Sequence, residues 1–201
     1  NLNVENIIPV GVDERVFYKE ENVSKDIDFL FVGSYYHVKG IDIIIEALNR
    51  LGKESKNINF CFVGTGPFYQ SLEALKKQLN ITLLGSKNHQ ELRELYNRSR
   101  FLLCHSRSEG FPTVTLESMY SGTPVIVSDI PQYLEQIEEC KNGWSSPLGD
   151  SEALMDLILK LYSMQDDEYK QHSKYASSSL KEFSLINVAR KLSYIYQKLS
   201  Q

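Results

Sequence analysis

Apolar runs and amphipathic segments alternate along the chain with little linker between them. Continuous apolar runs that end in glycine or a small polar residue are typical of strands buried on both faces. Such runs occupy residues 28–34, 59–64, 81–85, 101–106 and 123–129. Segments with helical character follow them at 40–51, 67–79, 89–99 and 112–121. This alternation predicts an α/β fold with one doubly wound parallel sheet and helices on both of its faces.

The segment SEGFPTVTLE (108–117) sets two carboxylates on either side of a helix start. Pro112 fits a first helical position, because its backbone angle is already helical and its missing N–H loses no hydrogen bond. Glu109 then precedes the helix, and Glu117 lies about one turn inside it. The first backbone amides of such a helix point out of its positive end and can bind phosphate oxygens. Two acceptor side chains beside an anion site suit a ligand with hydroxyls and phosphates, such as a nucleotide-sugar.

This segment resembles the Glu-x7-Glu motif of the retaining family-4 glycosyltransferases ("glycosyl transferases, group 1"), and the stretch SGTPVIVSD (121–129) strengthens the resemblance. The resemblance implies that Glu109 is the catalytic-site residue, which lies beside the donor sugar, positions it and stabilises charge. It implies that Glu117 accepts hydrogen bonds from the ribose hydroxyls. The intervening backbone would hold the diphosphate at Gly110, Phe111, Thr113 and Val114. Without its context, the motif would be read as one solvated loop glutamate and one glutamate that favours the helix dipole.

The loop after the first strand, FVGSYYHVKG (31–40), matches the family in part. Relatives usually carry Gly-Arg after this strand and Lys-Gly a few residues later, and the Arg and Lys grip the donor diphosphate. Here Gly33 and Lys39 match, but Ser34 stands where the Arg is expected. Either donor affinity is lower, or another cation compensates, with Arg107 the nearest candidate in sequence. Lys39 could instead be a solvated helix-start lysine, although a cation is unfavourable at a helix N-terminus.

Two further strand ends agree with the resemblance. Gly64 and Gly66 follow the second strand, but Tyr69 replaces the third glycine of a dinucleotide-binding fingerprint. In the family a similar turn closes the wall of the donor pocket, and a plain strand-to-helix turn is the equal alternative. After the third strand, the resemblance implies that the backbone of Leu84 and Gly85 holds the base. Main-chain recognition would leave uracil and guanine undistinguished.

Composition sets only wide limits. The chain has 201 residues, 42% of them hydrophobic, which is enough for one substantial core. A net charge of −4 without a basic stripe argues against a nucleic-acid partner, and no apolar run approaches membrane-spanning length. Cys61, Cys104 and Cys140 lack a metal-type spacing, and the first two lie in apolar runs, which predicts buried reduced thiols and a cytoplasmic protein. We expect neither a metal nor a cofactor.

The remaining polar and aromatic candidates carry less weight. His105 is expected to end its strand, with a role in the donor pocket as the alternative. His37 could reach a phosphate, and the loop aromatics Tyr35 and Tyr36 could line a sugar site or simply pack. The run 164–170 and the other histidines are expected to be solvated surface.

Both ends of the chain fit the same family. The segment IIPVGVD (7–13) resembles the hinge after which the family's second domain begins, so residues 1–201 are expected to form the donor-binding domain without its acceptor-binding partner. Ser184 can cap a C-terminal helix over 184–200, whose apolar stripe is expected to pack on the absent domain. The stripe consists of Leu185, Val188, Leu192, Ile195 and Leu199.

The resemblance implies the C-terminal half of a two-domain GT-B enzyme, a single Rossmann-like domain. The enzyme would be a retaining hexosyltransferase that moves a sugar from a UDP- or GDP-sugar to a glycan, lipid-linked or small acceptor in polysaccharide biosynthesis. We expect it in the cytoplasm, with peripheral association at the inner membrane face, and expect the isolated domain to be inactive. The alternatives are a related GT-B phosphorylase and a non-catalytic nucleotide-sugar-binding or scaffold domain, which Ser34 favours.

Overall fold

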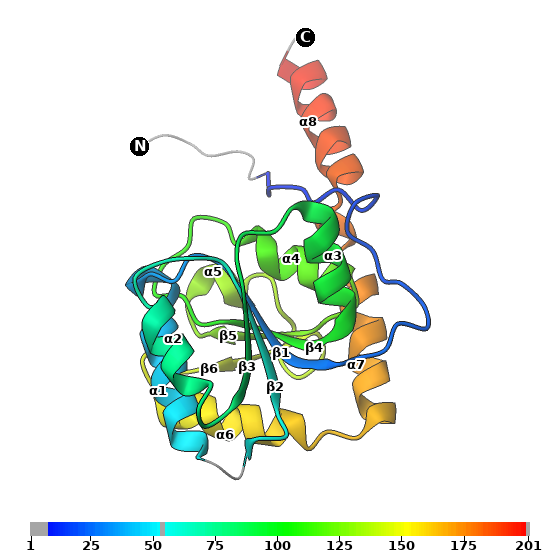
Figure 1. The fold of residues 1–201 in the computed structure, drawn as a ribbon. Helices are drawn as coiled ribbons and strands as arrows, with labels where there is room; N and C mark the ends of the chain where they lie inside the picture. The colour runs from blue at the N-terminus through cyan, green and yellow to red at the C-terminus, as the bar shows by residue number, and fades with distance from the viewer. Residues whose placement is uncertain (1–7, 53–54, 200–201) are drawn as a thin grey trace.

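The computed structural model describes residues 8–52 and 55–199, so Ile7 of the expected hinge and Ser200 of the expected last helix lie outside the described residues (Figure 1). Its centre is a six-stranded sheet in the order β3-β2-β1-β4-β5-β6, in which all neighbouring strands run parallel. The strands are β1 (Ile27–Val32), β2 (Asn59–Val63), β3 (Asn80–Leu84), β4 (Ser99–Cys104), β5 (Val125–Ser128) and β6 (Gly143–Ser146). The predicted doubly wound parallel sheet is therefore confirmed.

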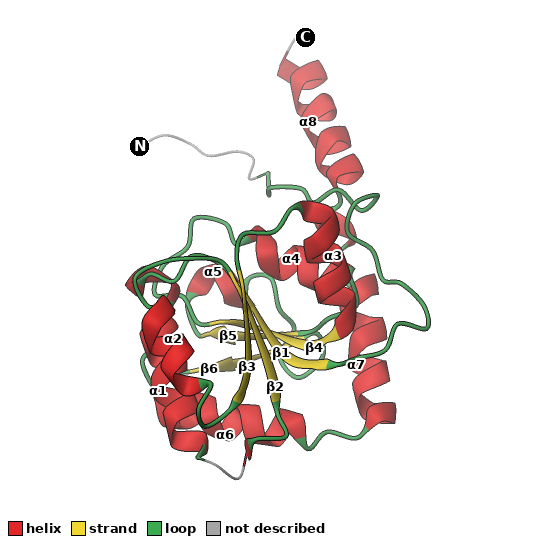
Figure 2. Ribbon diagram, viewed as in Figure 1, coloured by secondary structure: helices red, strands yellow, loops and turns green. Residues whose placement is uncertain are grey.

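Helices cover both faces of the sheet (Figure 2). One face carries α1 (Ile41–Leu51), α2 (Tyr69–Leu75) and α6 (Ser151–Tyr162). The other carries α3 (His89–Arg98), α4 (Thr113–Tyr120), α5 (Pro131–Leu134) and the C-terminal part of α7 (Asp166–Ser178). Two 3-10 turns, η1 (His37–Lys39) and η3 (Lys181–Phe183), precede α1 and α8 (Leu185–Leu199).

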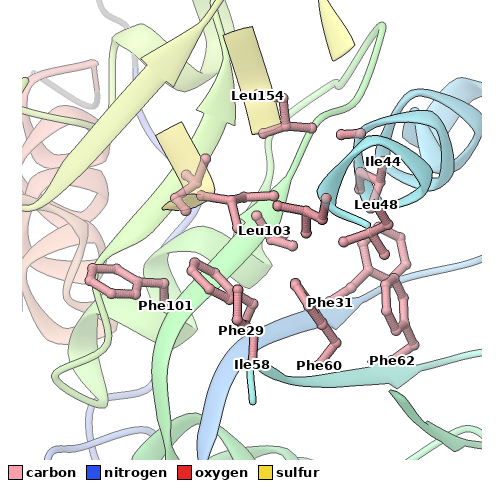
Figure 3. Packing of buried hydrophobic residues seen from close by; sticks show 14 of the residues in the cluster. Phe29, Phe31, Ile44, Leu48, Ile58, Phe60, Phe62, Phe101, Leu103 and Leu154 are labelled. Atoms are coloured by element: carbon pink, nitrogen blue, oxygen red, sulfur yellow. The ribbon is translucent and has the colours of Figure 1, made fainter. Parts of the chain in front are cut away.

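Alternation along each strand explains the continuous apolar runs. Phe29 and Phe31 of β1 point into the core under α1 and α6, where Phe29 stacks between the rings of Phe60 and Phe101 (Figure 3). Leu30 between them belongs to the opposite core under α3 and α4. Because both faces of the sheet are covered, successive residues of a strand are all apolar.

Several elements differ from the sequence-based expectation. The helix expected over 67–79 is regular only over α2, and β6, α5, α6 and α7 had no prediction. The run 164–170 was expected to be solvated, but its Tyr169 is buried and meets the ring of Phe101 edge-on at 5.6 Å. His172 likewise packs on Trp144, with 4.9 Å between ring centroids. For Tyr169 and His172 the expectation was wrong, because α7 turns one side toward the edge of the core. Residues 165–168 and 170 are exposed as expected, and so is His89.

The last helix, α8, extends away from the body of the domain (Figure 1). Its predicted cap is confirmed, since the hydroxyl of Ser184 accepts a hydrogen bond from the amide of Asn187 at 3.3 Å. Glu14 joins this start of α8 to the N-terminal segment by accepting from Ser184 at 2.8 Å and from the amide of Leu185 at 3.2 Å. None of the described helices combines the length and apolar character needed to cross a membrane.

Candidate functional site

The strand order changes direction between β1 and β4, which lie side by side at the centre of the sheet. In doubly wound sheets such a switch point opens a crevice at the carboxyl ends of the two strands. The loops after β1 and β4 touch there: Gly40 has φ +66°, and a Cβ at this position would lie 1.8 Å from the carbonyl oxygen of His105. Only glycine fits, and the close approach brings two distant segments of the chain to one site.

Lys39 and Glu109, predicted from separate motifs, meet across this switch point. The Lys39 ammonium group donates to Oε1 of Glu109 at 2.8 Å and to Oε2 at 2.9 Å. The Lys39 side chain is 32% exposed and that of Glu109 is 10% exposed, so the pair lies at the rim of the site rather than free in solvent. A solvated helix-start lysine is therefore not what the structure shows.

Two hydroxyls that the sequence analysis missed also hold Glu109. Ser106, in the loop after β4, donates to Oε1 of Glu109 at 2.6 Å. Tyr133 of α5 donates to Ser106 Oγ at 3.0 Å and approaches the same Glu109 oxygen at 3.2 Å. Burial raises the pKa of Tyr133, which therefore stays protonated and can donate. Tyr133 follows β5 by five residues, and the rule that sites gather at strand ends could have pointed to it.

The motif helix begins one residue later than predicted. Pro112 has φ −76° and ψ 101°, an extended conformation, and is the N-cap of α4 rather than its first residue. No side chain caps this end, so the amides of Thr113 and Val114, both half-buried, stand at an uncapped helix start. A Cβ at Gly110 would meet nothing within 4 Å, so there is open space at this position of the motif loop. Phe111 in the same loop is half-buried and packs against Phe183, with 6.1 Å between the ring centroids.

Glu117 lies one turn inside α4, as predicted, and is half-buried. The hydroxyl of Tyr96, a fully buried residue of α3, donates to its Oε2 at 3.1 Å. Burial raises the pKa of Glu117, and hydrogen bonds from Tyr96 and Thr113 oppose part of this rise. One carboxylate oxygen is thus held by the scaffold.

Ser34 is exposed, and Arg107 is not a free replacement for the expected arginine. The Arg107 guanidinium donates to both carboxylate oxygens of Asp42 at 2.7 Å and to the carbonyl of His37 at 2.5 Å. Burial opposes the ionisation of Asp42, but the hydrogen bonds from Arg107 and from the backbone, together with the nearby charge of Arg107, lower its pKa overall. The imidazole of His37 also faces Asp42, at 3.5 Å. Arg107 therefore braces the loop after β1.

A surface cavity of about 230 Å³ lies where β1, β2 and β3 end. Of the predicted residues on these loops, Gly33, Ser34 and Gly64 line the cavity, whereas Gly66, Leu84 and Gly85 do not. Lys87 lines it as well and pairs with Glu91 at 2.7 Å. The sequence analysis missed Lys87, although it lies two residues after Gly85, the second of the predicted base-binding residues.

The glycine turn after β2 has a clear packing reason. Gly64 has φ +136°, and a Cβ there would lie 1.9 Å from the carbonyl oxygen of Gly33. Its amide donates to the carbonyl of Leu84 at 3.1 Å, and Gly66 lies against the backbone of Tyr35. The turn therefore joins the ends of β1, β2 and β3, while exposed Gly85 keeps its backbone at the surface.

His105 ends its strand inside the protein. It is 1% exposed, and its Nε2 lies 3.2 Å from the hydroxyl of Ser146. Burial lowers the pKa of His105 to about 4, so the imidazole is neutral near pH 7. Of the two loop aromatics, Tyr35 is fully buried and packs on Phe31, whereas Tyr36 is 53% exposed.

Within residues 8–52 and 55–199, no three histidine, cysteine or acidic side chains gather closely enough to hold a metal ion. The three cysteines are free thiols, and Cys61 and Cys104 are buried as predicted, whereas Cys140 is exposed.

Comparisons with known proteins show which family this chain resembles. Residues 12–179 match the sequence model of the family described as "Glycosyl transferases group 1". An uncharacterized glycosyltransferase of Methanocaldococcus jannaschii is 30% identical over 198 residues, covering 96% of this chain and 54% of that protein. The amylovoran biosynthesis glycosyltransferase AmsK of Erwinia amylovora is 24% identical over 174 residues, covering 81% of this chain and 43% of that protein.

A solved structure shows the same fold. The Anabaena protein HepE, crystallised with UDP and glucose, has a TM-score of 0.81 at 17% identity, covering 96% of this chain and 56% of that one. The chain thus spans about half the length of the curated relatives it matches. Because the family model covers most of the described sequence, this chain belongs to the glycosyl transferases group 1 family.

Proposed function

We propose that this chain is the nucleotide-sugar-binding domain of a retaining, family-4-type glycosyltransferase. The observation that carries the proposal is the meeting of Lys39 and Glu109 at 2.8 Å beside the uncapped start of α4. A cation and free helix amides suit a diphosphate, and a carboxylate beside them suits sugar hydroxyls. The Anabaena structure with UDP and glucose supports a UDP-linked donor.

Each part of the donor has a proposed place. The diphosphate binds between Lys39 and the backbone of the motif loop, at Gly110, Phe111, Thr113 and Val114. Glu117 holds the ribose, and Glu109 holds the sugar. The base lies at the end of β3, near Leu84 and Gly85, on the side of the cavity that Lys87 lines.

The chemistry follows from where charge develops. Breaking the bond between the anomeric carbon and the diphosphate leaves negative charge on the phosphate oxygens, which Lys39 and the amides of α4 stabilise. Positive charge develops on the sugar, and the Glu109 carboxylate beside it offsets that charge. In this proposal the acceptor attacks from the same face as the departing diphosphate. Glu109 positions the donor sugar and stabilises its developing positive charge without forming a covalent bond to it.

The acceptor would bind to a second domain that packs on α8. Of the predicted stripe, Leu185 is exposed but Val188 is buried in this domain, and Ile186, Tyr194 and Tyr196 add exposed apolar surface. Closure of two domains brings donor and acceptor together and excludes water, so the domain alone should not transfer sugar. The name of the Erwinia relative supports polysaccharide biosynthesis as the setting. A cytoplasmic location, with the complete enzyme at the inner face of the membrane, belongs to the same proposal.

A second candidate is a domain that binds nucleotide-sugars without catalysing transfer. Ser34 removes one expected phosphate ligand, and Arg107 is committed to Asp42. Diphosphate binding would then rest on one lysine and the helix start. Such a weakened site could bind a donor without stabilising its departure.

Calorimetric titration with UDP, GDP and their sugar derivatives tests whether the chain binds a nucleotide-sugar donor. We expect dissociation constants between about 1 µM and 1 mM. Lys39→Met should weaken diphosphate binding at least about tenfold, whereas Lys170→Met, a change of an exposed lysine on α7, should not alter it. Absence of nucleotide binding would contradict both candidates. Binding without sugar transfer by the complete protein, on any acceptor, would favour the second.

A further inference from the structure

The hydroxyls of Ser106 and Tyr133 form a directed chain onto Glu109. Ser106 gives its only proton to Oε1 of Glu109 at 2.6 Å, so its oxygen is free to accept the proton of Tyr133 at 3.0 Å. Tyr133 is 1% exposed and Ser106 is 2% exposed. Neither group can exchange this partner for water without a change in the surrounding structure.

The elements that carry these groups are fixed. The carbonyl of Ser106 accepts a hydrogen bond from Ser128, the last residue of β5, at 2.6 Å. Pro131 starts α5 three residues farther along, and the amide of Tyr133 donates to the carbonyl of Ile130 at 3.1 Å. The loops after β4 and β5 therefore set the tyrosine and serine as one unit.

We infer that Tyr133 is a positioning residue that acts through Ser106 to hold Oε1 of Glu109 and leave Oε2 for the donor sugar. The inference rests on the proposed function. The two oxygens have different surroundings. Among the described residues, Oε1 accepts from Ser106 and Lys39 and lies 3.2 Å from the Tyr133 hydroxyl, whereas Oε2 accepts only from Lys39. When a diphosphate draws Lys39 away, the Ser106 hydroxyl, which is itself held by Tyr133, still fixes Oε1. Oε2 then lacks a partner and can accept a sugar hydroxyl in a defined direction.

Simple packing is the competing explanation. Tyr133 belongs to the core between the sheet and α4, and a phenyl ring would fill the same space. Phenylalanine at this position removes the hydroxyl and keeps the ring, so Tyr133→Phe separates the two explanations. Tyr169→Phe is the matched control, because Tyr169 is also buried, at 5% exposed, and its hydroxyl donates to the backbone carbonyl of Ser99 at 3.4 Å, away from Glu109.

The measurement is the affinity for three nucleotide-sugars, each compared with its own nucleoside diphosphate. UDP-glucose and UDP-N-acetylglucosamine are compared with UDP, and GDP-mannose is compared with GDP. Tyr133→Phe should leave nucleoside-diphosphate affinity within about twofold and weaken the best nucleotide-sugar by about 5- to 20-fold. This loss is smaller than that for deleting a hydrogen bond to a charged group, because Tyr133 acts through Ser106. Tyr169→Phe should change neither affinity. Ser106→Ala should weaken nucleotide-sugar binding as much as Tyr133→Phe does. It replaces Tyr133→Phe in the test if that variant does not fold.

A double-mutant cycle with Glu109→Gln identifies the route of the effect. If Tyr133 acts through Glu109, adding Tyr133→Phe to Glu109→Gln should weaken sugar binding by less than about twofold. The inference would be overturned if Tyr133→Phe left the nucleotide-sugar affinity unchanged. It would also be overturned if Tyr133→Phe weakened nucleotide-sugar binding as much in the Glu109→Gln protein as in the parent. Neither result would affect the proposed nucleotide binding. A parent chain that binds neither UDP nor GDP would contradict the proposed function itself, and the inference with it.

Discussion

Lys39 donates to both carboxylate oxygens of Glu109, at 2.8 and 2.9 Å, although 70 residues separate the two along the chain. In the free protein each charge therefore neutralises the other. A diphosphate that binds at this point must compete with the Glu109 carboxylate for the same ammonium group. The cation proposed for the phosphates and the carboxylate proposed for the sugar are thus linked before any ligand arrives.

Glu109→Gln should separate these two roles. We expect it to tighten UDP binding by about 3- to 10-fold, because Lys39 loses a competing anion and the site loses a negative charge. The same change should reduce the affinity that the sugar adds to that of UDP, because an amide is a poorer hydrogen-bond acceptor than a carboxylate. Calorimetry with UDP and UDP-sugars measures both effects.

Glu46→Gln is the control for this experiment, because Glu46 also forms an ion pair, with Arg50 on the exposed side of α1 and away from the site. It should alter neither affinity. A Glu109→Gln protein that binds UDP less tightly than the parent would show that the ion pair does not compete with the phosphates.

Replacing Glu117 with alanine should weaken nucleotide binding by about 10- to 100-fold, a loss of about 1.5–3 kcal/mol for a charge-assisted hydrogen bond. The loss should be similar for UDP and uridine, because the proposed contact is to the ribose. Glu168→Ala, which removes an exposed carboxylate on α7, should leave binding unchanged. Equal affinities of the parent and Glu117→Ala for UDP would exclude Glu117 as the ribose ligand.

Ser34→Arg should restore a phosphate contact. Ser34 is exposed and lines the cavity at the ends of β1 and β2, so a longer side chain has room there. We expect affinity for UDP to rise by at least about 1 kcal/mol more than affinity for uridine, because only the diphosphate meets the new charge. Ser163→Arg, an exposed change after α6, is the control. Equal gains for UDP and uridine would show that the loop does not face the phosphates.

Folding stability should depend on the protonation of His105. Its pKa is lowered from an ordinary value near 6.5 to about 4 in the folded protein. Between these values the unfolded chain binds more protons, so the free energy of unfolding should fall as the pH falls from 6.5 toward 4.

His105→Gln removes this dependence and keeps a polar group near Ser146. Between pH 6.5 and 5, the variant should lose about 1–2 kcal/mol less stability than the parent. Urea unfolding at several pH values measures the difference. Glu117 titrates in both proteins, so its raised pKa cancels in the comparison. Identical pH profiles for the two proteins would show that His105 is accessible to protons in the folded state.

The sequence determined the sheet and most of its surroundings. Runs such as 28–34 and 59–64 are apolar at every position because both faces of these strands are covered, and this local pattern is readable without coordinates. The loops that carry Lys39, Glu109 and Glu117 were found from motifs within single segments. Strand β6 and helix α7 escaped prediction, because their short or largely polar sequences become buried only where other elements cover them.

Only the tertiary structure decided which of these residues meet. Strand order places the loop after β1 beside the loop after β4, and no local signal in the sequence encodes that neighbourhood. The tertiary structure also decided that Arg107 pairs with Asp42, and that Tyr133 reaches Glu109 through Ser106. Side-chain hydrogen bonds between distant segments depend on distance and direction in space. A linear sequence fixes the groups, and the packed sheet fixes their partners.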